Sequence, residues 1–108
     1  MREKLISDLT SLKQSIAKAN SEVYMAAREL MTVKDELRIE ENSLIRGGII
    51  DGKNAEIRAA QMYEHTIMER QNVAEAEDYL EASKVTLSNL QTELRINLAL
   101  VELVKGVA

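Results

Sequence analysis

A heptad repeat of apolar residues runs along the first half of the chain, and it limits the possible folds more than any other feature. At the twelve positions reached from Leu5 by alternating steps of four and three, eleven residues are apolar and only Glu40 is not, although hydrophobic residues make up just 45% of the chain. This spacing places one continuous apolar stripe along a single long helix, as in a coiled coil. The first stripe consists of Leu5, Leu9, Leu12, Ile16, Ala19, Val23, Ala26, Leu30, Val33, Leu37, Glu40 and Leu44.

A second stripe with the same spacing follows in the other half of the chain, and it is less regular. Eleven of its fifteen positions are apolar. Where a polar residue takes such a position, the stripe either loosens or gains a residue that sets register and partner choice. The second stripe consists of Ala55, Ala59, Met62, Thr66, Glu69, Val73, Ala76, Leu80, Ser83, Leu87, Leu90, Leu94, Asn97, Val101 and Val104.

A glycine-rich segment, residues 46–54, separates the two stripes and holds three of the chain's four glycines. Glycine lets a helix end and the chain reverse, and Asp51 or Asn54 can cap a following helix. A short connection between long helices makes them antiparallel neighbours. We therefore predict an all-α fold, with residues 1–108 forming a single domain that is one long antiparallel helical hairpin of the coiled-coil type. Its first helix covers about residues 3–46, its turn 47–52 and its second helix about 53–105.

Composition supports this fold class and argues against several functions. The chain has no proline, cysteine, phenylalanine or tryptophan, and without cysteine it forms neither a disulfide nor a thiolate metal site. Its net charge of −4 argues against nonspecific nucleic-acid binding over the whole surface. No apolar stretch is long enough to cross a membrane, and the first ten residues lack the apolar core of a secretory signal. We therefore expect a cytoplasmic protein with no membrane partner.

Folding the chain about Ile49 and Ile50 sets the expected register of the hairpin. Leu5 then lies opposite Leu94, so that residues from about 98 onward overhang the end of the first helix. Exposed apolar patches usually mark interfaces, and one hairpin buries few side chains against the backbone entropy lost on folding. We therefore predict a homodimer or larger oligomer, most simply a four-helix bundle. Its interface residues are expected in the overhang or in minor apolar stripes beside the main ones: Tyr24, Met31, Tyr63, Ile67, Leu98, Leu100, Val101, Leu103 and Val104.

No group of residues suggests catalysis or a cofactor. His65 is the only histidine, and the Glu-x-x-His spacing of helical di-iron proteins is absent because residue 62 is methionine. The segment from Gly47 to Lys53 meets the glycine and lysine positions of a phosphate-binding loop, but Asn54 replaces the required serine or threonine. We therefore expect no enzyme activity, no catalytic residue, no metal and no cofactor.

The hairpin tip carries the most specific sequence. Ile49 and Ile50 are β-branched apolar residues at a turn, where they either plug the end of the bundle or anchor a partner. With Lys53, Asn54 and Arg58 they form the expected partner-binding surface. The string Gly52-Lys53-Asn54-Ala55-Glu56-x-Arg58 resembles small helical proteins encoded in bacterial phages and prophages. This resemblance implies a phage or mobile-element origin, and hence the cytoplasm of a bacterial host, and it supplies no catalytic residues.

These features indicate a non-enzymatic, oligomeric coiled-coil interaction protein, which would act as a phage accessory factor that binds a host or phage macromolecule. The alternative is a nucleic-acid-linked protein. One form of it would bind DNA or RNA through Arg46, Lys53 and Arg58 at the tip. The other would mimic nucleic acid and inhibit a host protein with an acidic face formed by Glu75, Glu77, Asp78 and Glu81.

Overall fold

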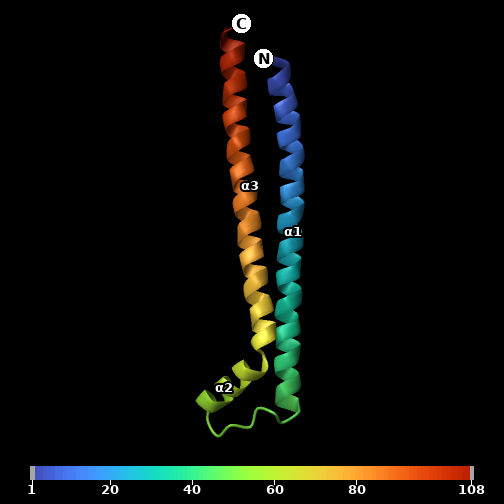
Figure 1. Cartoon of the computed structure of the whole chain (residues 1–108), viewed down its shortest axis with the longest axis vertical. Helices are drawn as coiled ribbons and strands as arrows, with labels where there is room; N and C mark the ends of the chain where they lie inside the picture. The colour runs from blue at the N-terminus through green and yellow to red at the C-terminus, as the bar shows by residue number, and fades with distance from the viewer. Residues whose placement is uncertain (1, 108) are drawn as a thin grey trace. The chain divides into compact units, whose positions relative to one another are not determined.

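The chain folds into helices, and no strand occurs among residues 2–107, the part of the chain that the computed structural model describes. Helix α1 covers Arg2–Arg46, α2 covers Ala55–His65 and α3 covers Ile67–Val107. α1 and α3 run antiparallel (Figure 1). The all-α fold with a long antiparallel helical hairpin, predicted from the sequence, is therefore confirmed. Met1 and Ala108, the two ends of the predicted domain, lie outside the described residues.

Two compact units make up the hairpin, and each combines residues from both halves of the chain. The terminal unit consists of the described residues of Met1–Met25 and Leu80–Ala108. The tip unit is Ala26–Tyr79, and it contains the loop, α2 and the first turns of α3. Because α1 and α3 each contribute a segment to both units, the same two stripes supply the core of each.

The two apolar stripes form the contact between the helices within each unit, as the heptad spacing predicts. Every position of the first stripe is buried or half-buried, and so is every position of the second stripe from Met62 to Val104. Ala55 and Ala59 are exposed, so the prediction is wrong at these two positions. Alanine at several buried positions lets the helix axes approach closely, since side chains at the contact set the interaxial distance. The buried apolar residues are Leu12, Ala19, Ala26, Val33 and Ala76.

The second helix is interrupted at Thr66, so the prediction of one continuous helix over residues 53–105 is wrong. Thr66 has φ −124° and ψ 24°, outside the helical range. Its backbone N–H donates to the carbonyl of Tyr63 at 3.2 Å, and its hydroxyl donates to the carbonyl of Met62 at 2.6 Å. In a continuous helix the Met62 carbonyl would accept the N–H of Thr66, but here it accepts the hydroxyl while the N–H bonds Tyr63, so the helical hydrogen bonding stops at this residue. α2 therefore leaves the line of α3 (Figure 1), and none of its residues is buried.

This interruption shifts the pairing of the helices, and the predicted overhang is wrong. In the terminal unit Leu5 lies with Val101 and Val104 around one cavity, about two helical turns beyond the predicted partner Leu94. The shift arises because the residues of α2 do not pair with α1. Residues of α3 therefore pair with positions of α1 that lie nearer the loop, as Arg70 does with Glu41. Val101 and Val104 are half-buried members of the hairpin's own stripe.

The hydroxyl of Thr66 should stabilise the fold at this interruption. We expect Thr66→Val to lower the free energy of unfolding by about 1–3 kcal/mol, because the variant removes a buried hydroxyl and leaves its partners unsatisfied. The measurement is urea unfolding followed by circular dichroism. The matched control is Thr32→Val, since the Thr32 hydroxyl also bonds the carbonyl four residues back, at 3.1 Å, but on an exposed surface. Equal effects of the two substitutions would contradict a special role for Thr66.

Candidate functional site

α1 ends in a hydrogen-bonded reversal that begins the tip. The N–H of Ile49 donates to the Leu44 carbonyl at 3.1 Å, and the N–H of Gly48 donates to the Ile45 carbonyl at 3.2 Å. These two bonds form a Schellman motif, whose turning residue takes a left-handed conformation. Gly48 has φ +71°, a conformation that glycine adopts without steric cost. The glycines between the two stripes therefore end the first helix, as their position predicts.

Gln61 of α2 holds the loop against the helix. Its side-chain oxygen accepts hydrogen bonds from the backbone N–H groups of Asp51 at 3.1 Å and Gly52 at 2.9 Å. Its side-chain nitrogen donates to the Asp51 carboxylate at 3.0 Å. The Asp51 side chain is therefore bound to Gln61, and of the two predicted capping residues it is Asn54 that caps α2. The sequence did not indicate Gln61, because its partners lie nine and ten positions away and follow no local spacing rule.

The start of α2 is fixed by a capping residue and a close approach. The side-chain oxygen of Asn54 accepts the N–H of Ile57 at 2.9 Å, which is the N-cap bond expected of asparagine. Gly52 lies so close to α2 that an added Cβ would stand 2.5 Å from Cγ2 of Ile57. The guanidinium of Arg58 donates to the Gly52 carbonyl at 3.1 Å. Arg58, predicted to bind a partner, therefore also braces the loop.

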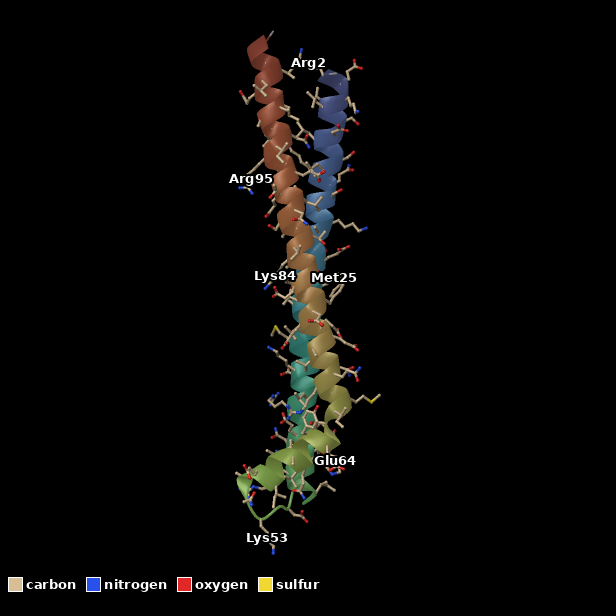
Figure 2. All side chains as sticks on the ribbon, turned by 60° about the vertical axis from the view of Figure 1, so that its left-hand side comes forward. Arg2, Met25, Lys53, Glu64, Lys84 and Arg95 are labelled. Atoms are coloured by element: carbon tan, nitrogen blue, oxygen red, sulfur yellow. The ribbon has the colours of Figure 1, made fainter. Side chains whose placement is uncertain are left out.

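The predicted partner-binding residues lie together on this ordered tip. Ile49 is 47% exposed, whereas Ile50 is half-buried, so one isoleucine packs against the tip and the other stays open to solvent. Lys53 is exposed and points away from the loop (Figure 2). An apolar and a cationic side chain on a hydrogen-bonded backbone suit a contact with another molecule, because a preorganised surface loses little entropy on binding.

A second ordered cluster, which sequence reasoning missed, joins α1 to α3 at the interruption. Arg70 donates from Nε to the Thr66 hydroxyl at 2.9 Å and from a terminal nitrogen to the Glu41 carboxylate at 3.4 Å. Its guanidinium also lies 5.8 Å from the centre of the Tyr63 ring, within cation–π range. Thr66 is 0% exposed, and these bonds offset the cost of burying its hydroxyl.

The residues predicted to form oligomer interfaces fall into two groups. Val101 and Val104 are half-buried in the terminal unit. The other seven are large apolar side chains that remain exposed on their helices. They are Tyr24, Leu98, Leu100 and Leu103 in the terminal unit and Met31, Tyr63 and Ile67 in the tip unit.

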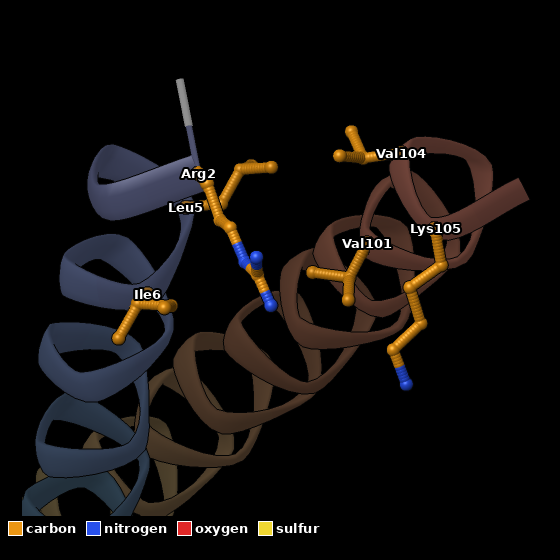
Figure 3. A pocket seen from close by; sticks show the side chains of 6 residues that line it. All are labelled: Arg2, Leu5, Ile6, Val101, Val104 and Lys105. Atoms are coloured by element: carbon orange, nitrogen blue, oxygen red, sulfur yellow. The ribbon is translucent and has the colours of Figure 1, made fainter. Parts of the chain in front are cut away.

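An apolar cavity of about 340 Å³ opens at the end of the terminal unit (Figure 3). Leu5, Ile6, Val101 and Val104 form its apolar lining, and Arg2 and Lys105 supply two cationic side chains. The stripe positions here are half-buried, whereas Leu12, two turns further along α1, is buried. The helix contact is therefore looser at this end of the unit.

The described residues form neither a cluster of metal-ligating side chains nor a helix that could span a membrane. Among them, no group of three or more His, Asp or Glu side chains is arranged to hold a metal ion. Every buried side-chain nitrogen or oxygen in residues 2–106 has a hydrogen-bond partner. No helix in the described part of the chain has the length and apolar character needed to cross a membrane. No protein-family model, curated protein or solved structure matches the chain.

Gln61 should control the mobility of the loop. We expect Gln61→Ala to speed amide hydrogen exchange at Asp51 and Gly52 about tenfold, because both N–H groups lose their acceptor. The measurement is hydrogen exchange followed by NMR. Gln71→Ala is the control, since its side chain reaches only Glu75, at 3.5 Å, on an exposed surface. Unchanged exchange in Gln61→Ala would show that the loop is ordered by other contacts.

Gly52 should be required for the contact between the loop and α2. We expect Gly52→Ala to lower the free energy of unfolding by about 1–3 kcal/mol, because the new methyl group overlaps Ile57. Thermal unfolding measures this effect. In the control, Gly106→Ala, the new methyl group meets nothing within 4 Å, and we expect no loss of stability. A Gly52→Ala variant as stable as the native chain would contradict the close packing described above.

Proposed function

We propose that this chain is a non-enzymatic interaction protein that assembles with further copies of itself, as a homodimer or larger helical oligomer. The exposure of large apolar side chains beside an ordered helix contact carries this proposal. In the tip unit Met31 is 67% exposed, Tyr63 60% and Ile67 52%. Exposed apolar groups that cluster on one side of a protein favour association, because contact removes their surface from water.

These three side chains share the flank of the tip unit that carries the Glu41–Arg70 ion pair, called here the bridge flank. On α1, Met31 lies ten residues before Glu41, a step of seven followed by a step of three. On α3, Ile67 lies three residues before Arg70. Such spacings return to the same side of a helix. Tyr63 lies beneath the Arg70 guanidinium. Tyr63 and Ile67 therefore lie close to the ion pair, and Met31 lies on the same flank about 15 Å farther along α1, away from the loop.

We further propose that the tip binds a second kind of macromolecule. Ile49 and Lys53 are exposed there on a loop held by Gln61, Asn54 and Arg58. The likeness of the Gly52–Arg58 string to small phage proteins supports the role of a phage accessory factor that acts in a bacterial cell. Capture of partners from a bacterial lysate with the native chain tests this role. A variant with alanine at Lys53, Asn54 and Arg58 is the control.

Self-assembly makes a direct prediction for the native mass. We expect the purified chain to have the mass of at least a dimer in native mass spectrometry, and Met31→Glu with Ile67→Glu to reduce it to a monomer, because carboxylates would replace apolar contact groups. The control is Ile39→Glu with Met68→Glu. Ile39 is 60% exposed and Met68 74%, but each lies two residues from the ion pair and so faces another side. A native chain that is monomeric at high concentration would refute the proposal.

A further inference from the structure

The tip unit has two flanks beside its helix contact, and they differ in how charge is distributed. On the bridge flank, α1 carries Lys34 and Arg38, seven and three residues before Glu41, and α3 carries Glu77, seven residues after Arg70. Lys34, Arg38 and Glu77 are exposed. Positive charge therefore lies on one helix of this flank, and negative charge lies on the other at a similar distance from the ion pair.

These charges are available to a partner. Within the described residues, Lys34 and Glu77 form no ion pair. Arg38 pairs only with Asp35 on its own helix, at 3.5 Å, with both side chains exposed. An exposed ion pair of this kind contributes little to stability, so Arg38 loses little by taking another partner.

The opposite flank, called here the acidic flank, is unsuited to a second copy. A hollow of about 410 Å³ there is lined by the carboxylates of Glu29, Glu36 and Glu75, and neither lysine nor arginine lines it. Two copies meeting through this flank would set carboxylates against carboxylates. Like charges brought together in an interface oppose association.

We propose that a second copy of this chain docks on the bridge flank, with α1 of each copy lying against α3 of the other. This inference rests on the proposed self-assembly and adds the surface and the orientation. A twofold axis parallel to the helices produces such a contact and uses the same patch on both copies. Lys34 and Arg38 of one copy then lie at the level of Glu77 of the other copy.

The same arrangement pairs apolar groups near the loop. Ile45 lies four residues after Glu41, and Ile67 lies three residues before Arg70, so both are about one turn from the ion pair in the direction of the loop. Both are exposed, and the twofold axis sets Ile45 of one copy beside Ile67 of the other. An arrangement that set α1 against α1 would instead bring Lys34 and Arg38 against the same cations of the second copy.

Charge reversal tests this inference. One variant carries Lys34→Glu and Arg38→Glu, and the other carries Glu77→Lys. Each variant alone would set like charges together, so we expect its dimer to dissociate about a hundredfold more readily than the native dimer. An equimolar mixture should form a heterodimer, because every reversed charge then meets its opposite. Native mass spectrometry, with one variant isotopically labelled, separates the two homodimers from the heterodimer.

The control variant carries Glu29→Lys and Glu36→Lys on the acidic flank and should remain a homodimer. Circular dichroism checks that all variants keep their helices. If a variant fails to fold, the salt dependence of the native dimer tests the inference instead. Contact through the bridge flank must weaken as salt screens its charges, so a native dimer that added salt does not weaken would contradict this docking surface. Two results would overturn the docking surface while leaving self-assembly intact. One is that both charge-reversed variants form homodimers as stable as the native dimer, and the other is that the mixed variants form no heterodimer. A native monomer would overturn both.

Discussion

The break in the helix at Thr66 sets the position at which α1 and α3 begin to pair. The Thr66 hydroxyl takes the Met62 carbonyl that its own N–H would bond in a continuous helix, that N–H bonds Tyr63 instead, and α2 leaves the contact with α1. Arg70 completes the arrangement, since it donates to the same hydroxyl and reaches Glu41 on α1. α3 therefore begins beside α1 at a defined position. A polar residue within an apolar stripe sets the register here, a role that such residues also have in coiled coils.

The heptad spacing predicted the helix contact because periodicity is a property of the sequence itself. The stripes from Leu5 to Leu44 and from Met62 to Val104 are buried or half-buried as expected. The interruption could not be predicted in the same way, because Thr66 fits the spacing like its neighbours. Its effect depends on full burial and on a bond from Arg70, and neither is visible before the helices are packed. The predicted overhang after residue 98 failed for this reason, since it assumed one unbroken helix.

At the tip, too, contacts between residues close in the sequence could be predicted, and contacts between distant residues could not. Asn54 was predicted as a cap because capping depends on residues three positions apart, and the glycines marked the reversal through their backbone freedom. Gln61 was missed because its side chain binds the backbone of residues nine and ten positions away. The candidate partner-binding residues could therefore be named from the sequence, whereas the bonds that hold them in place could not.

A two-helix contact leaves most of each helix surface exposed, so the apolar and charged side chains on the two flanks of the contact stay accessible to a partner. The buried apolar residues of the stripes are few, and several are alanine, so the contact between α1 and α3 removes little apolar surface from water. In the proposed self-assembly, exposed apolar groups such as Met31 and Ile67 would supply a further driving force, but they would not define an orientation, since the hydrophobic effect is nondirectional. Charges do define one, because opposite signs must meet. Under the proposed self-assembly, a flank that combines exposed apolar groups with cations on α1 and an anion on α3 would determine both that a second copy binds and which helix it meets, whereas the carboxylates of the acidic flank would disfavour a second copy there.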